Sequence, residues 1–310
     1  MSTVRLVALN CIVSCLFAQS VWAIMAGGEF SLPADTPSGR IDPLSSGSST
    51  NFVGALGIDA GGSNYFGSGS ALSQHWVLTA GHNVDFNDNG VPDAGLGIDF
   101  YLPGFGSYSA TSYVTNPNFG GFGNPTIHND LALLYFEDAL PSLAFPALGL
   151  SMGLDDTFIL AGFGRSGYGS YGYTTDASLT DRRLGQNVVD SFEQESGGAG
   201  LLFRYDFDAP GTFGTVGGSL GNTIETLIAP GDSGGAALLD YEGRLALVGV
   251  NTFTEGYGGL FGDIGGGVAL DPYWGWISET TGLSLVPELS QSAMLTGMLA
   301  LLIVSLRRGR

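Results

Sequence analysis

Three residues that lie far apart in the chain could act together as a nucleophile and its base: His82, Asp130 and Ser233. A serine hydroxyl is a poor nucleophile at neutral pH, and it needs an imidazole to take its proton. A carboxylate must in turn hold that imidazole in the right tautomer and orientation. Such a set performs acyl transfer through a covalent intermediate on the serine.

The segment around the serine, Gly231–Gly235, is the most specific of the three. Glycines on both sides of Ser233 let the backbone turn sharply and leave the hydroxyl exposed. The same turn points the backbone N–H groups of Gly231 and Ser233 at one spot. We therefore expect these two groups to form an oxyanion hole, in which each donor is worth about 3 kcal/mol.

Many short strands must position these residues. Strand-like segments follow one another along the chain, glycine-rich turns separate them, and the sequence holds 51 glycines but no long helical pattern. This pattern predicts an all-β barrel or sandwich. The predicted strands are Asn51–Ile58, Ser68–Ser73, His75–Thr79, Ile98–Tyr101, Leu131–Phe136, Thr157–Phe163, Leu201–Phe207, Ala236–Leu239, Leu245–Asn251 and Gly267–Leu270.

One helix is predicted near the end, over Tyr273–Glu279, because Asp271 and Pro272 can begin it. The segment Leu140–Gly149 has the prolines of a linker and divides the chain into two halves. The first half holds His82 and Asp130 and the second holds Ser233. The site is therefore expected in the cleft between the halves.

The three segments resemble those of chymotrypsin-like (trypsin-fold) serine endopeptidases of bacterial secreted type. The matching segments, in the family's order of His, Asp and Ser, are Trp76–His82, Asn129–Leu134 and Gly231–Gly235. The resemblance covers about Ile41–Thr281. It implies that His82 is general base and then general acid, that Asp130 orients it, and that Ser233 attacks the substrate.

The resemblance also implies the fold and the reaction. The expected fold is all-β, with two antiparallel six-stranded β-barrels and a short C-terminal helix in a protease domain over 41–284. The barrels would span about 41–145 and 150–270. The chain would be a monomeric endopeptidase that hydrolyses polypeptides and needs no cofactor for its chemistry.

Two positions beside the histidine depart from the family's pattern. Gly81 stands in the place of a usual alanine, and Asn83 stands where other members have a cysteine that forms a disulfide. The only cysteines of the chain, Cys11 and Cys15, lie within a predicted signal peptide. The mature protein would therefore have no disulfide, which agrees with the second departure.

The specificity pocket is predicted from the same resemblance. Trypsin-like enzymes have an acidic residue six positions before the serine, where this chain has Leu227, so cleavage after Arg or Lys is disfavoured. Glu225 is an alternative acidic residue for the pocket. The strand that pairs with substrate would include Thr252, Phe253 in place of tryptophan, and Thr254 in place of glycine. We expect a shallow pocket for apolar or small side chains.

Two bonds are candidates for an activating cut. In the family, a freshly cleaved N-terminal isoleucine forms an ion pair with the aspartate before the serine, here Asp232. Ile41 follows Arg40 and lies 41 residues before His82, which matches the family's spacing and is favoured. Cleavage of the signal peptide would instead expose Ile24, whose following residues resemble the family's N-terminal motif.

The segment after the histidine could hold calcium. Oxygen-bearing side chains occur at positions one, three, five and nine of an EF-hand-like loop, at Asp85, Asn87, Asn89 and Asp93. Leu96 stands where the bidentate glutamate of such a loop belongs. The other interpretation is a solvated turn rich in Asp and Asn. Both interpretations stay open from the sequence.

The N-terminus predicts export. Residues 1–23 combine Arg5, the apolar run Leu6–Phe17 and a small-residue site for signal peptidase that ends at Ala23. A lipoprotein signal at Cys15 is the alternative. Residues 24–40 would form a propeptide or an N-terminal arm.

The C-terminal segment 285–310 resembles a PEP-CTERM sorting tail of Gram-negative bacteria. It has Val286–Leu289, then the apolar stretch Ala293–Leu306, then a basic end, with Leu289 in the place of the motif's second proline. An exosortase-like enzyme would process such a tail, whereas a simple hydrophobic membrane anchor, a transmembrane helix, is the alternative. The protein would be periplasmic, surface-bound or extracellular.

The charge excludes one class of partner. The net charge is −19, and all ten basic residues are arginines. Binding to nucleic acid through phosphates is therefore not expected. The competing function is a catalytically silent, surface-anchored binding or matrix protein built on a protease scaffold.

Overall fold

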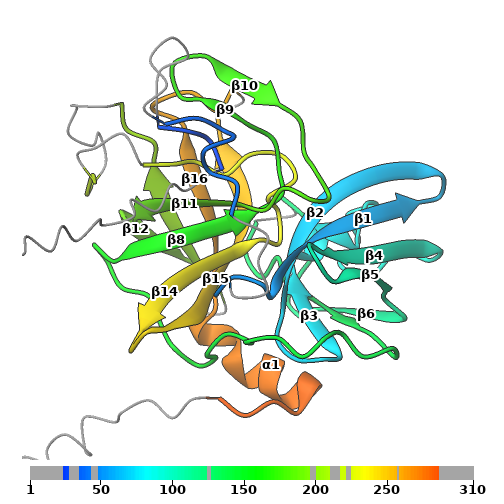
Figure 1. The fold of residues 1–310 in the computed structure, drawn as a ribbon. Helices are drawn as coiled ribbons and strands as arrows, with labels where there is room; N and C mark the ends of the chain where they lie inside the picture. The colour runs from blue at the N-terminus through cyan, green and yellow to red at the C-terminus, as the bar shows by residue number, and fades with distance from the viewer. Residues whose placement is uncertain are drawn as a thin grey trace, which may run out of the picture.

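The computed structural model describes residues 24–27, 35–42, 48–123, 127–195, 200–209, 217–220, 225–256 and 258–285. The predicted signal peptide and, apart from Leu285, the predicted sorting tail lie outside these residues. Two curled antiparallel sheets lie side by side, and the single α-helix of the described residues lies beneath them in Figure 1. The predicted all-β class is confirmed.

The first sheet has seven strands in the order β5-β4-β1-β2-β3-β7-β6. Their bounds are β1 Val53–Ala60, β2 Ser63–Ala71, β3 Trp76–Thr79, β4 Leu96–Leu102, β5 Gly106–Ser109, β6 Ser112–Thr115 and β7 Ala132–Tyr135. Only Ala110 and Thr111 separate β5 from β6. The amide of Ala110 donates to Ile98 of β4, and that of Thr111 donates to Tyr135 of β7. The bent segment 106–115, which contains β5 and β6, thus pairs with β4 at one edge of the sheet and with β7 at the other. The sheet closes into a barrel, and its seven strands form six continuous segments of chain.

The second sheet closes in the same way, with the order β11-β8-β14-β15-β16-β13-β12. Its strands are β8 Thr157–Gly162, β11 Arg183–Val188, β12 Ser191–Gln194, β13 Leu201–Asp206, β14 Ala236–Tyr241, β15 Arg244–Glu255 and β16 Ile264–Ala269. Only Val189 and Asp190 separate β11 from β12. Since β11 pairs with β8 and β12 with β13, this bent segment again joins the two edges. Both predicted six-stranded barrels are therefore present.

Three smaller elements complete the fold. A hairpin of β9 (Ser166–Tyr168) and β10 (Gly172–Thr175) projects from the second barrel (Figure 1). A 3-10 turn, η2 (Asp271–Tyr273), leads into helix α1 (Trp274–Thr281), which ends at Gly282 in the left-handed conformation, φ 71°. The predicted helix over 273–279 is confirmed with small shifts of its bounds. Among the described residues, no helix has the length and apolar character needed to span a membrane.

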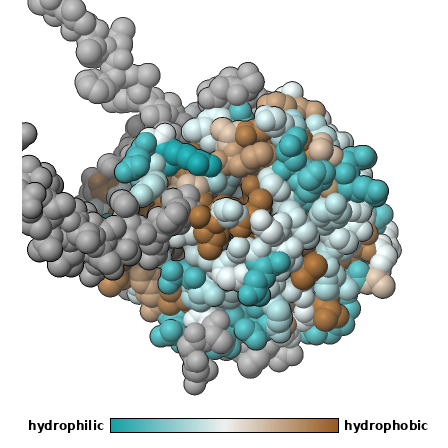
Figure 2. Space-filling view, turned by 90° about the horizontal axis from the view of Figure 1, so that it is seen from below, coloured by the Kyte–Doolittle hydropathy of each residue, from teal (hydrophilic) through white to brown (hydrophobic). Residues whose placement is uncertain are grey.

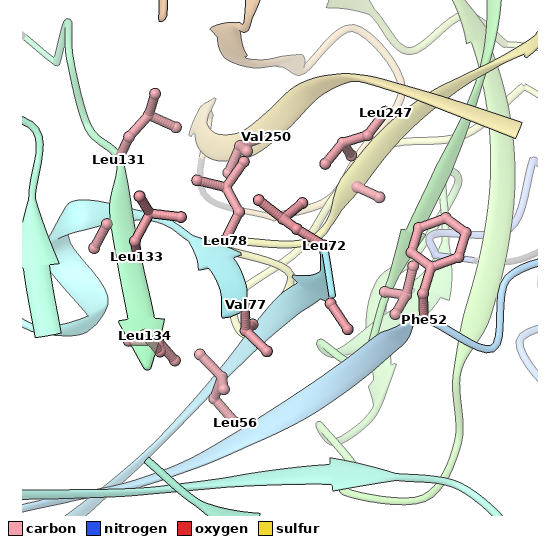
Figure 3. Packing of buried hydrophobic residues seen from close by; sticks show 14 of the residues in the cluster. Phe52, Leu56, Leu72, Val77, Leu78, Leu131, Leu133, Leu134, Leu247 and Val250 are labelled. Carbon is pink, nitrogen blue, oxygen red and sulfur yellow. The ribbon is translucent and has the colours of Figure 1, made fainter. Parts of the chain in front are cut away.

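The largest cluster of buried apolar residues contains side chains from both barrels. Leu78 and Leu133 come from the first barrel, and Leu247 and Val250 come from the second (Figure 3). Burial of each such side chain is worth about 1.5–3 kcal/mol, so this cluster fixes one barrel against the other. On the surface, hydrophobic residues occur in small groups between hydrophilic ones on the face shown in Figure 2.

Candidate active site

His82 and Asp130 meet because strand β3 pairs with strand β7. Thr79 of β3 lies opposite Ala132 of β7, so the residues just outside both strands are neighbours. His82 lies in the 3-10 turn η1 (Gly81–Asn83). The fully buried Asp130 carboxylate holds it twice: Oδ2 lies 2.7 Å from the ring Nδ1, and Oδ1 accepts the His82 backbone N–H at 2.8 Å.

The departure at Gly81 has a steric cause. A Cβ at this position would lie 2.9 Å from the ring of Phe119 and 3.1 Å from Oδ1 of Asp130. A side chain here would therefore press on the carboxylate that holds His82. Glycine lets the histidine turn and the aspartate approach each other closely.

The pKa of the His82 imidazole is raised above its ordinary value. Burial lowers this pKa, but the negative charge and hydrogen bond of Asp130, with a further contribution from the charge of Asp88, outweigh burial. With Nδ1–H facing Asp130, the other ring nitrogen, Nε2, is left to act as a base. The pair can accept a proton from a nearby hydroxyl and stabilise the imidazolium that results.

Ser233 lies in a sharp turn that packs against β2. Gly231 and Gly234, on either side of it, have positive φ angles of 99° and 85°. A Cβ at Gly234 would lie 2.1 Å from the main-chain oxygen of Ser68, so only glycine fits there. Among the described residues, the backbone N–H groups of Gly231 and Ser233 donate to no other backbone oxygen, which leaves both for a ligand.

Asn83 ties the serine turn to the histidine turn. Its side-chain amide donates to the main-chain oxygen of Ser233 at 2.9 Å and to the hydroxyl of Thr79 at 2.9 Å. The same oxygen of Ser233 accepts the N–H of Ser68 at 2.8 Å. Sequence reasoning noted Asn83 only as a missing cysteine. The signal that could have found it is its position beside His82 and its amide, which suits a buried hydrogen bond.

Asp232 points away from the cleft into the second barrel. Its carboxylate accepts the backbone N–H groups of Gly164 at 2.7 Å and Ala229 at 2.9 Å. Burial raises the pKa of Asp232 to about 6, against the effects of these two hydrogen bonds and of the charge of Arg183. None of the salt bridges among the described residues includes Asp232.

His82 and Ser233 line one hollow of about 290 Å³. Its other lining residues are Phe122, Ile228, Ala229, Pro230, Thr252, Phe253 and Thr254. The ring of Phe122 lies 4.7 Å from that of His82 and covers it from one side. Apart from His82, the described lining carries no ionisable side chain, so the hollow suits apolar or small groups.

Of the predicted pocket residues, Thr252, Phe253 and Thr254 line this hollow, whereas Leu227 does not. Leu227 is fully buried in the core of the second barrel. Glu225 is also outside the hollow: it is 1% exposed, and Oε2 accepts the backbone N–H of Asp208. Burial and the neighbouring charge of Asp208 raise the pKa of Glu225 to about 8.

The first described segment, 24–27, is inserted into the second barrel. Ile24, Met25 and Ala26 are fully buried. The N–H of Met25 donates to the oxygen of Leu227 at 2.9 Å, and Ala26 forms a bridge with Tyr168 of β9. This segment therefore packs against the chain that leads to Asp232.

Ile41 lies elsewhere, and the uncut chain does not bring it to Asp232. Its N–H faces the oxygen of Ser38 at 3.4 Å, and it forms a bridge with Arg183 at the start of β11. The preceding Arg40 is fully buried, and its guanidinium is bound by the Asp35 carboxylate. The Ile41–Asp232 ion pair stays a prediction for a chain cut at this bond, and the burial of Arg40 shields that bond from an activating protease.

The loop considered as a candidate calcium site is closed by its own hydrogen bonds. The Asp85 carboxylate accepts the backbone N–H groups of Asn89 at 3.1 Å and Gly90 at 2.7 Å. The Asp93 carboxylate accepts the N–H of Phe86 at 2.9 Å and the side-chain amide of Asn87. In the described part of the chain, no three acidic, histidine or cysteine side chains are grouped as metal ligands.

Comparisons with known proteins agree with this arrangement. A family model described as Trypsin matches residues 44–277. Among solved structures, HL collagenase is similar in fold: the TM-score is 0.53 at 19% sequence identity, and the match covers 76% of this chain and 95% of that chain. No curated protein matches the chain.

Proposed function

Because the chain belongs to the trypsin family, we propose that it is an exported serine endopeptidase in which Ser233, His82 and Asp130 form the catalytic triad. The observation that carries this proposal is the pair of hydrogen bonds between the buried Asp130 carboxylate and His82. His82 and Ser233 line the same hollow. No cofactor is needed for this chemistry.

The reaction proceeds in two halves. Nε2 of His82 takes the hydroxyl proton as the Ser233 oxygen bonds to the substrate carbonyl carbon, and the backbone N–H groups of Gly231 and Ser233 stabilise the oxyanion. His82 then gives its proton to the leaving amine as the C–N bond breaks. His82 next takes a proton from water as the water oxygen bonds to the acyl carbon. The bond between that carbon and the Ser233 oxygen then breaks, His82 returns its proton to Ser233, and the acid is released.

The hollow favours a small or apolar side chain before the scissile bond. Thr252, Phe253 and Thr254 form one wall, and no acidic side chain of the described lining could bind Arg or Lys. The same lack of charge supports the prediction made from Leu227, although Leu227 itself lies deeper in the core.

Activation is proposed to follow the removal of residues 1–23. The predicted signal peptide ends directly before Ile24, and Ile24 is already buried beside the segment 227–229 that leads to Asp232. A free amine on Ile24 would supply the positive charge that the Asp232 carboxylate lacks, whereas the bond before Ile41 is shielded by buried Arg40. This reverses the preference that spacing alone gave to Ile41.

Labelling with a fluorophosphonate tests the proposed function. Mature protein that begins at Ile24, shown by N-terminal sequencing, should be labelled at Ser233 and should cleave a peptide library. Ser233→Ala should abolish both. Correctly processed protein that is not labelled would overturn the proposal, and binding without any cleavage would favour the silent scaffold.

A further inference from the structure

Asn129, the residue directly before Asp130, shapes the turn that presents the carboxylate. It is 2% exposed and has a left-handed backbone, φ 63°, which asparagine tolerates better than most residues. Its main-chain oxygen accepts the N–H of Leu131 at 2.7 Å, so the backbone reverses around Asp130. The direction of the Asp130 carboxylate therefore depends on this turn.

Two residues from the second half of the chain hold the side chain of Asn129. The hydroxyl of Tyr273, in η2, donates to Oδ1 of Asn129 at 2.9 Å. Nδ2 of Asn129 donates to Oε2 of Glu195, just after β12, at 3.0 Å. Because the acceptor and a donor of the amide are both engaged, the side chain has one orientation.

The Tyr273 hydroxyl keeps its proton at neutral pH. Burial raises the pKa of Tyr273 to about 12, against the effects of the neighbouring backbone groups and with the charges of Glu195 and Asp130 adding to the shift. Tyr273 therefore stays a donor to Asn129 over the whole working range of pH. Gly200 packs on this contact, since a Cβ there would lie 3.0 Å from the Tyr273 oxygen.

We propose that Asn129 is a positioning residue, and that Tyr273 and Glu195 hold it so that the Asp130 carboxylate stays aligned with the His82 ring. Asp130 directly precedes Leu131 and strand β7 of the first barrel, whereas Glu195 follows β12 of the second barrel and Tyr273 lies in η2, after the second barrel's last strand. The packing of the barrels thus sets the basicity of the imidazole as well as its distance from Ser233. The proposal rests on the proposed function, because it assigns the alignment a role in that reaction.

Titration of His82 by NMR tests the alignment without any turnover. The chain has only three histidines, so the His82 signal can be told apart from those of His75 and His128. Asp130 raises the pKa of His82, so a misaligned carboxylate should lower it. Tyr273→Phe should therefore shift the His82 titration to lower pH. Tyr113→Phe, which removes a 3.1 Å hydrogen bond to Leu96 far from the triad, should not.

Steady-state kinetics provide the second measurement. The concentration of active enzyme is taken from the fraction that a fluorophosphonate labels at Ser233. Tyr273→Phe should lower kcat about tenfold to a hundredfold with little change in KM, because a small misplacement of a catalytic group costs rate. Glu195→Gln keeps an acceptor for Asn129 and should retain activity, whereas Glu195→Ala should lose it. A merely structural role would lower only the melting temperature.

An unchanged His82 titration together with an unchanged kcat in folded Tyr273→Phe would overturn the proposal. Should that variant fail to fold, Glu195→Ala at its half-buried position decides by the same two measurements. A wild-type protein that neither cleaves peptides nor reacts with the fluorophosphonate would refute the proposed function. The NMR titration of His82 would still test whether Asn129 and its partners align Asp130.

Discussion

The side-chain amide of Asn83 lies 2.9 Å from the main-chain oxygen of Ser233, so the residue that follows His82 holds the turn that carries Ser233. Asn83 is 4% exposed. Its hydrogen bond to Ser233 joins the two barrels beside the hollow that His82 and Ser233 line. A hydrogen bond of this side chain therefore links the histidine turn to the serine turn.

Replacing this amide should weaken both the fold and the reaction. Asn83→Ala leaves the oxygen of Ser233 with only the Ser68 amide as partner, and loss of a buried hydrogen bond costs about 1–3 kcal/mol. Fluorophosphonate labelling should slow by about tenfold, since the serine turn becomes less fixed. Stopped-flow labelling and calorimetry measure the two effects. The exposed Asn118→Ala is the control, and equal rates in both variants would contradict the prediction.

The charge of Asp88 should be visible in the pH dependence of cleavage. Asp88 helps to raise the pKa of His82. Asp88→Asn should therefore lower that pKa and move the acid limb of the kcat/KM profile to lower pH. The profile of Asp59→Asn, at an exposed position in the hairpin of β1 and β2, should match the wild type. An acid limb that moves to higher pH would contradict this sign.

The size of the hollow should decide which peptides are cleaved. Thr254→Gly removes a side chain from its wall, so kcat/KM for a peptide with Phe before the scissile bond should rise about tenfold relative to Ala, because such pocket changes are worth about 1–3 kcal/mol. Matched fluorogenic peptides measure this ratio. The exposed Thr111→Gly provides a comparison. A ratio that stays constant would mean that another wall sets the preference.

Buried acids should make the precursor more stable in mild acid. Burial raises the pKa of Glu225 to about 8, of Asp190 to about 7 with help from Asp206, and of Asp232 to about 6. The folded state thus holds more protons than the unfolded state between about pH 4 and pH 8, and stability falls as pH rises through this window. The melting temperature of uncleaved Ser233→Ala protein should be higher at pH 5 than at pH 8.

The matched variants for this measurement are Glu225→Gln and Glu242→Gln. The first removes a buried titrating group and should flatten the dependence on pH. The second changes an exposed turn residue and should leave it unaltered. A melting temperature that increases from pH 5 to pH 8 would show that other groups dominate the balance.

Removal of calcium should have little effect on the loop 85–93. The carboxylates of Asp85 and Asp93 already accept hydrogen bonds from within the loop. We expect the same melting temperature in EDTA and in millimolar calcium. A rise with calcium that Asp93→Asn abolishes, and that Asp59→Asn preserves, would instead establish the cation site.

All ten strands predicted from the sequence correspond to observed strands, but six observed strands were not predicted: β5, β6, β9, β10, β11 and β12. Strands β5 and β12 are mostly half-buried or exposed. Strand β11 is mostly buried, but its sequence mixes polar residues with apolar ones and has no apolar run. The proposed triad residues could be named from the sequence because their neighbours are distinctive. The roles of Tyr273 and Asn83 could not, since each depends on a contact between residues more than a hundred positions apart.

The activation site illustrates the same limit. Spacing along the chain favoured Ile41, but spacing carries no information on burial. Only the fold shows that Arg40 is enclosed with Asp35 and that Ile24 lies within the second barrel. The pairing of Arg40 with Asp35, five residues earlier, is not visible in the spacing between Ile41 and His82.

Residues 24–27 lie beside Leu227, directly after the end of the predicted signal peptide. On the proposed function, the peptidase that releases the chain from the export pathway also creates its working N-terminus. No dormant form would then accumulate outside the inner membrane, and a chain retained in the cytosol would be harmless to the proteins around it. Restraint of the released enzyme would fall to inhibitors and to the supply of substrate.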